Sequence, residues 1–195
     1  IMGKSVNAFL AKAGSLIVEL KERADVSPYI VSELTALFRE VKEAMEKIKE
    51  LETNIDSIAK TLKQYDLFRS APGVGPITAA TMLVLLCNPA VFKNGREFAA
   101  YIGLAPKSSG SGGKNFVTHI PKKCECNNDV RALLVQCAHS ICRCKHKSDW
   151  VSSILARKPK KVAIIAIANK LARQLWIMAK KGEKFERRFI LAAAQ

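Results

Sequence analysis

The 195-residue sequence predicts a mainly all-α protein, with a long helical segment followed by a compact helical domain. From Leu34 to Tyr65, apolar residues recur in alternating steps of three and four, which is the spacing of a helical seam. A Pro-Gly-Val-Gly turn then separates two further helical stretches. The charge also divides: residues 1–66 carry 10 Lys and Arg against 11 acidic residues, and residues 67–195 carry 22 against 6. We therefore expect a helical segment over 1–66, a basic domain over 67–186 and a short tail over 187–195.

The composition excludes several classes of protein. Hydrophobic residues make up 49% and charged residues 25%, which excludes wholesale disorder. The net charge of +15 indicates a polyanionic partner, with nucleic acid the first candidate and an anionic membrane surface the second. The sequence contains no run of 18 uncharged apolar residues, so no membrane span is expected. The start lacks the apolar stretch of a signal peptide. An isoleucine in first place suggests a fragment or a processed chain.

The first part reads as two helices. Residues 5–24 form an apolar-rich stretch, and Ser27-Pro28 marks the break before the long helix. Glu and Lys fill the positions around the seam, and no Gly or Pro interrupts it. A narrow apolar stripe sustained over more than four heptads predicts a coiled coil or a helical hairpin, and hence a homo-oligomer, dimer or tetramer. The alternative is a helix packed on its own domain.

The basic domain opens with a helix-hairpin-helix pattern. A helix ends near Ala71-Pro72, the turn follows, and an Ala-rich helix starts with Pro76 in its first position. The glycines permit a tight turn and allow backbone N–H groups to approach a phosphate, without reading bases. We expect such contacts at Gly73, Val74 and Gly75. A plain helical hairpin with a Gly-rich turn is the alternative.

A Ser/Gly run follows a short helix at 96–102 that ends at Gly103. Composition alone favours a flexible linker, but the run is short, and basic residues flank and follow it. Small residues allow a polymer backbone to come close, and a serine hydroxyl there could attack phosphorus if it were activated. A short hairpin is expected around Asn115–His119. The basic residues and glycines expected to bind nucleic acid here are Lys107, Gly112, Gly113, Lys114, Lys122 and Lys123.

The last helix is expected at 160–181, ended by Gly182. Its apolar residues predict a core helix, with Lys170, Arg173 and Gln174 on a second surface. The basic run before it includes Lys158, Lys160 and Lys161, which form either a solvated loop or a patch that contacts a nucleic-acid backbone.

Two Cys-x-Cys pairs raise the question of zinc. They are Cys124 with Cys126 and Cys142 with Cys144, and together they could supply four thiolates. The spacing is tighter than that of the usual zinc knuckle, and Cys137, Cys142 and Cys144 lie in an apolar helical stretch. Buried free thiols are the simpler interpretation.

Taken in order, these motifs resemble the insertion-sequence-110 transposases. The resemblance is carried by four segments: Ala71–Pro76, Phe98–Pro106, Ser111–Lys114 and Arg131–Gln136. Residues 161–176 continue it. More narrowly, residues 67–186 look like the C-terminal domain shared by the 110, 116 and 902 types, and the predicted coiled coil stands where that family has its helical dimerisation segment.

The resemblance implies a DNA recombinase whose serine attacks a phosphodiester. Ser111 matches the family's nucleophile, because it follows the Gly-Leu-x-Pro segment and precedes a glycine; Ser108 and Ser109 match less well. The family also implies a guide RNA and an N-terminal RuvC-like domain that binds Mg²⁺ through four acidic residues. Nothing in residues 1–66 resembles that domain, so no metal or cofactor is expected in this chain.

Two departures leave the activity of this chain open: the acidic domain has no counterpart in residues 1–66, and one turn is replaced. The expected Lys-Arg-Gly turn is replaced by residues 122–127, which suggests a diverged copy. The resemblance therefore allows either the DNA-binding and catalytic part of a transposase or a non-catalytic nucleic-acid-binding remnant or regulator. In both cases we expect a cytoplasmic, nucleoid-associated protein of a bacterium or archaeon with DNA as its partner and no membrane.

Overall fold

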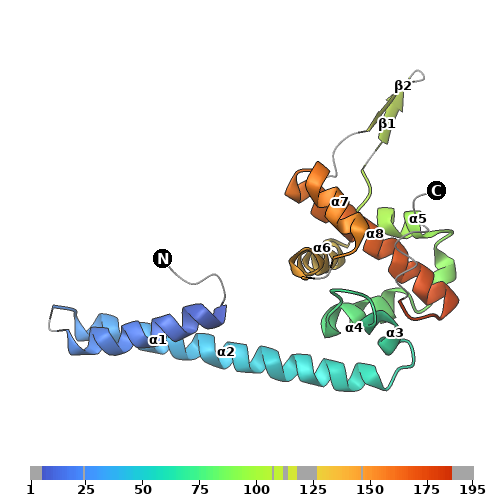
Figure 1. Ribbon diagram of the computed structural model, residues 1–195. Helices are drawn as coiled ribbons and strands as arrows, with labels where there is room; N and C mark the ends of the chain where they lie inside the picture. Colours follow the sequence, from blue (N-terminus) through green and yellow to red (C-terminus); the bar gives the residue numbers. More distant parts are fainter. Residues whose placement is uncertain are drawn as a thin grey trace. The chain divides into compact units, whose positions relative to one another are not determined.

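The computed structural model describes residues 6–23, 25–106, 108–111, 114–117, 127–145 and 147–185, with the backbone alone at 6–7 and in the two strands. It divides into two compact units, 1–54 and 55–195. The mainly all-α prediction is confirmed, because the regular elements of the described part are helices apart from one two-stranded hairpin (Figure 1). Sequence composition places the boundary at residue 66; the structure places residues 55–66 with the second unit, since Ala59 and Tyr65 lie in its core.

The first unit is a pair of helices. Helix α1 (Val6–Glu22) runs back along the first half of α2 (Pro28–Lys60), as Figure 1 shows. Pro28 stands in the first position of α2, where its missing N–H costs nothing. The two helices approach closely at Gly14, where an added Cβ would lie 3.4 Å from the Phe38 ring. The long helix therefore begins six residues before the apolar seam and ends five residues before Tyr65.

The apolar seam of α2 is not covered by α1. The stripe of α2 that is at least half-buried contains Val31, Thr35, Phe38 and Met45, which lie about a quarter-turn around the helix from the seam. Seam residues stay exposed: Leu37 by 56%, Ile48 by 51% and Ile58 by 68%. The half-buried stripe and the heptad seam thus lie on different faces of α2, and the seam residues of α2 are exposed to solvent.

The second unit packs short helices around α8 (Lys160–Lys181). The elements before it are α3 (Tyr65–Arg69), α4 (Pro76–Leu85), the 3₁₀ turn η1 (Pro89–Val91), α5 (Gly95–Tyr101), α6 (Asn128–Arg143) and α7 (Asp149–Arg157). Helices α3, α5, α6 and α7 and the turn η1 all contact α8. The largest enclosed side chains include Phe68, Phe98 and Leu134. One core therefore fixes the turn between α3 and α4, the base of the hairpin and the start of α8.

Helix α8 is a core helix, as its sequence predicts. It ends at Gly182, which has φ +70°, the left-handed conformation that favours glycine. Among the described residues, α8 is the one helix that is long and apolar enough to cross a membrane. However, 67% of its apolar stretch is buried inside the protein. The prediction of a second, polar surface is wrong: Lys170 and Gln174 are 5% and 7% exposed, because other elements surround α8 on most sides.

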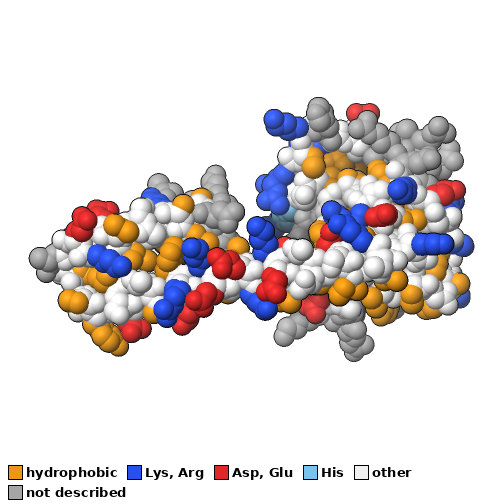
Figure 2. All heavy atoms as spheres, turned by 90° about the horizontal axis from the view of Figure 1, so that it is seen from below, with side chains coloured by type: hydrophobic (Ala, Val, Ile, Leu, Met, Phe, Trp, Pro, Cys, Tyr) orange, Lys and Arg blue, Asp and Glu red, His pale blue; other side chains and the backbone are white. Residues whose placement is uncertain are grey.

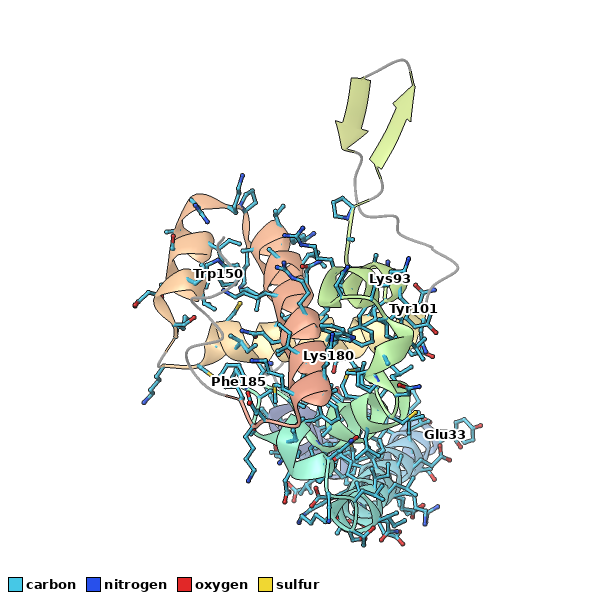
Figure 3. All side chains as sticks on the ribbon, turned by 90° about the vertical axis from the view of Figure 1, so that its right-hand side faces the viewer. Glu33, Lys93, Tyr101, Trp150, Lys180 and Phe185 are labelled. Atoms are coloured by element: carbon cyan, nitrogen blue, oxygen red, sulfur yellow. The ribbon has the colours of Figure 1, made fainter. Side chains whose placement is uncertain are left out.

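The Ser/Gly run forms a β-hairpin. Strands β1 (Ser108–Ser111) and β2 (Lys114–Val117) pair antiparallel, so the hairpin starts about seven residues earlier than expected. Figures 1 and 3 show it extending away from the helices of its unit. The first four residues of a presumed linker are therefore a strand, with the second strand starting at Lys114.

Candidate nucleic-acid interface

The turn between α3 and α4 is held by its packing against α6. Gly73 has φ +76°, and a Cβ there would lie 2.7 Å from the Cys137 carbonyl oxygen and 2.9 Å from Ile141 Cγ1. No side chain fits between that turn and the α6 backbone without a shift. Gly73 therefore serves a close helix-to-turn contact.

Val74, the next residue, has both backbone groups engaged within the turn. Its N–H donates to the Ala71 carbonyl, and its carbonyl accepts a 2.6 Å hydrogen bond from the Arg69 guanidinium. The side chain is buried. Val74 thus presents no free backbone group to a phosphate, and Arg69, which sequence reasoning did not single out, fixes the turn.

A small polar network links the end of α2 to the start of α3. The Tyr65 hydroxyl donates to Asp56, and Lys60 forms a 2.7 Å ion pair with the same carboxylate. These two partners lower the pKa of Asp56. Burial and the bond to Asp56 raise the pKa of Tyr65 to about 12. The last turn of α2 is thereby joined to α3.

The start of α4 is the part of the turn that remains open. Gly75 precedes Pro76 in extended backbone, no atom lies within 4 Å of its Cβ position, and no described side chain caps the helix. The buried Cys137 thiol of α6 donates a hydrogen bond to the Thr78 hydroxyl in the first turn of α4, over 3.5 Å. Burial raises the pKa of this thiol. Of the three residues predicted to contact phosphate here, Gly75 is the one with open space around it.

Ser111 and Lys114 lie at the far end of the hairpin. They are direct partners in the register, Ser111 as the last residue of β1 and Lys114 as the first of β2. The Ser111 backbone is thus placed at the far end of the hairpin, paired in the register with Lys114 three residues further along the chain. Lys107, Gly112, Gly113, Lys122 and Lys123 lie outside the described residues.

Lys158, Lys160 and Lys161 form the basic loop at the start of α8, and all three are exposed. Figure 2 shows Lys and Arg side chains spread over the second unit with few acidic ones, whereas both signs mix on α1 and α2. No hydrogen bond or ion pair among the described residues joins the basic loop, the turn and the hairpin. The three predicted groups therefore stand on separate elements of the same unit.

A cleft of about 780 Å³ opens beside α8, where α6, α7 and the turn meet. Trp150 and Phe185 line it, and Figure 3 shows both on the same side of α8. The Lys170 ammonium lies 4.0 Å from the centre of the Trp150 ring, a cation–π contact. Burial, and then repulsion from Arg173, lowers the pKa of Lys170. Sequence reasoning missed this cleft because Lys170 reads as a surface residue on the helical pattern.

The cysteines of the described part are free thiols. Cys137 is buried and Cys142 half-buried, while Cys87 and Cys144 are exposed. Cys144 is exposed because α6 ends at Arg143, so the prediction of burial is wrong for this residue. In the ranges the structure covers, no group of three or more His, Cys, Asp or Glu side chains could hold a metal ion. Cys124 and Cys126 lie outside those ranges.

The second unit thus combines an extended hairpin, an open glycine at a helix start and three exposed lysines at the start of α8. Residues 65–151 match the family described as Transposase IS116/IS110/IS902 family. The matched segment is a domain of that family, which confirms the resemblance seen in its motifs.

Relatives match across most of the chain. The transposase for insertion sequence element IS1328 of Yersinia enterocolitica is 31% identical over 176 residues, covering 88% of this chain and 52% of the relative. The protein y4pF/y4sB of Sinorhizobium fredii is 35% identical over 185 residues, 90% of this chain and 47% of the relative. The transposase for IS1111A of Coxiella burnetii is 28% identical over 174 residues, with shares of 87% and 47%. The chain thus spans about half the length of these relatives.

Proposed function

We propose that this chain is the C-terminal part of an insertion-sequence transposase, which binds DNA and supplies Ser111 as the nucleophile for strand exchange. The observation that carries the proposal is the placement of Ser111 at the tip of the hairpin, in a domain of this family. An exposed arm can reach the backbone of a bound polymer, and small neighbours let the two chains come close. Lys114, its partner in the register, provides a positive charge near the developing charge on phosphorus.

A serine hydroxyl needs more than one lysine to attack phosphorus. The proton must leave the hydroxyl, and the charge on the phosphoryl oxygens must be neutralised. In the family that residues 65–151 match, a divalent metal such as Mg²⁺ on an acidic N-terminal domain would supply that neutralisation. The residues of this chain then have two tasks: to hold the DNA backbone and to present the hydroxyl in line with the leaving oxygen.

DNA binding follows from the distribution of charge. Residues 67–195 carry a net charge of +16, and each phosphate that a lysine or arginine neutralises releases counterions. The basic loop contributes three exposed lysines, and Gly75 offers an open approach to the start of α4. A structured guide RNA would present the same phosphate chemistry to these groups.

Self-association through the seam of α2 completes the proposal. Apolar residues at heptad spacing remain exposed along α2 although α1 already packs on its other stripe. A continuous exposed apolar seam on a helix is the surface that pairs with a second copy in a coiled coil. A strand-exchange reaction also needs more than one active serine, which a homodimer or tetramer provides.

The experiment is a strand-exchange assay with the remaining half of the transposase supplied in trans. We would add the part of the IS1328 transposase that this chain does not match, with Mg²⁺ and a donor duplex. Exchange that is lost in Ser111→Ala and kept in Ser109→Ala supports the proposal. DNA binding with no exchange under any condition would favour the alternative, a non-catalytic nucleic-acid-binding remnant or regulator.

A further inference from the structure

Arg96 and Arg173 lie at a close contact between α5 and α8. A Cβ at Gly95 would lie 3.2 Å from both the Cα and the carbonyl oxygen of Arg173, so only glycine allows this approach without a shift of backbone. Gly95 is buried in that contact. Arg96 follows immediately at the start of α5 and is exposed. The packing of the two helices thus places Arg96 one residue from the point where α5 touches the backbone of Arg173.

One donor of the Arg173 guanidinium lacks an acceptor. Arg173 Nε is buried and has no hydrogen-bond partner. None of the ion pairs in the described part of the chain includes Arg96 or Arg173. The carboxylate of Glu97, the nearest acid along α5, accepts a hydrogen bond from the Lys93 N–H. Burial, and then repulsion from Arg96, lowers the pKa of Arg173.

Such an arrangement is costly for the protein alone. Guanidinium donors that lie away from water are ordinarily hydrogen-bonded, and like charges close together destabilise a fold. An anion between the two groups would provide the missing acceptor and turn the repulsion into attraction. The planar donor fork of arginine matches phosphate oxygens in particular.

We infer that Arg96 and Arg173 form a clamp for a single phosphate of a nucleic-acid backbone. The inference rests on the proposed function, because it names the site at which the domain holds the strand. The two arginines are positioning residues, since they contact the backbone and not the reacting atoms.

The clamp lies on α8 close to the residue that anchors the base of the arm. One turn before Arg173 on α8, Asn169 Nδ2 donates a 3.0 Å hydrogen bond to the Leu104 carbonyl. Leu104 leads directly into the arm that carries Ser111. The clamp and the base of the arm are therefore anchored on neighbouring turns of one rigid helix. A phosphate held at the clamp fixes the strand relative to the arm.

The test uses the full chain and three variants. Arg173→Gln and Arg96→Gln each remove one guanidinium, and Arg173→Lys keeps the charge but removes the fork. The control is Arg143→Gln, which removes an exposed arginine at the end of α6 and changes the net charge equally. We would measure affinity for a 20-bp DNA duplex and for an RNA duplex of the same length by fluorescence anisotropy.

Each clamp variant should lose about tenfold or more in affinity relative to Arg143→Gln, because a charge-assisted contact to phosphate is lost. The clamp serves the nucleic acid on which its variants lose more affinity. In addition, inorganic phosphate should raise the melting temperature of the wild-type chain above that in chloride of equal ionic strength. This rise should be smaller in Arg173→Gln, where only the general stabilisation by an excluded anion remains. Without phosphate, Arg173→Gln should be at least as stable as the wild-type chain, since it removes a buried charge.

The outcomes separate the clamp from the proposed function. A wild-type chain that binds neither duplex contradicts the proposed function, while its response to inorganic phosphate still tests the clamp. Affinity and phosphate response in Arg173→Gln equal to those of Arg143→Gln would overturn the clamp. If Arg173→Gln failed to fold, Arg173 would have a structural role, and full binding by a folded Arg173→Lys and Arg96→Gln would overturn the clamp equally.

Discussion

Replacing Gly73 by alanine tests whether the turn between α3 and α4 is built for packing. The φ of +76° disfavours any side chain, at a cost of about 1–2 kcal/mol for the left-handed conformation. The added Cβ also meets the Cys137 carbonyl oxygen at 2.7 Å, and backbone cannot rotate away as a side chain can. Overpacking of this kind costs about 1–3 kcal/mol. We therefore expect Gly73→Ala to lower the free energy of unfolding by about 2–5 kcal/mol.

Gly75→Ala is the matched control, two residues away in the same turn. Gly75 has φ −85°, and its Cβ position is empty of atoms within 4 Å, so the free energy of unfolding should change by less than about 0.5 kcal/mol. Both variants would be unfolded in urea and followed by tryptophan fluorescence, since Trp150 and Trp176 both lie in the second unit. Equal stability of Gly73→Ala and the wild-type chain would refute the reasoning, as would equal losses in the two variants.

Three further predictions concern other parts of the chain. Ile48→Asp and Ile55→Asp should shift sedimentation toward monomer, because the apolar seam is exposed, while Glu46→Gln should not; a wild type that is monomeric at high concentration would contradict the seam's role. Changing the three lysines of the basic loop to Gln should reduce the slope of log K against log salt by up to about 2.7, and an unchanged slope removes the loop from the interface. In a spectrophotometric titration, one tyrosine should ionise near pH 12, and Tyr65→Phe should abolish that step. The stabilisation from the raised pKa of Tyr65 should hold below pH 10 and be lost as the pH rises toward 12, so a Tyr65→Phe chain with the same alkaline profile as the wild type would contradict the assignment.

Local signals in the sequence were enough to predict most helices. Pro76 at the first position of α4, Gly103 after α5 and Gly182 after α8 act through their own backbone preferences, which do not depend on the rest of the fold. The bounds of α8 match the prediction at both ends. The family resemblance was likewise readable, because it depends on the order of motifs along the chain.

Features that depend on tertiary packing could not be read in the same way. Gly73 looks like a glycine kept for a ligand, and only the position of α6 shows that a carbonyl oxygen fills the space. Lys170 looks exposed on a helical pattern, but α7 brings Trp150 over it. The pairing of Ser111 with Lys114 needed a strand register that a Ser/Gly run does not encode by hydrophobic alternation. The helix pair and the heptad seam also use different stripes of α2, which a single apolar pattern cannot separate.

The most direct test of the account is whether Ser111 forms a covalent bond with DNA. The chain would be incubated with Mg²⁺, a donor duplex and the unmatched part of the IS1328 transposase, then quenched with denaturant, digested and analysed by mass spectrometry. The account predicts a peptide containing residue 111 that carries a nucleotide on the serine oxygen, absent in Ser111→Ala and retained in Ser109→Ala. An adduct that survives Ser111→Ala, or one located on Ser108 or Ser109, would contradict it.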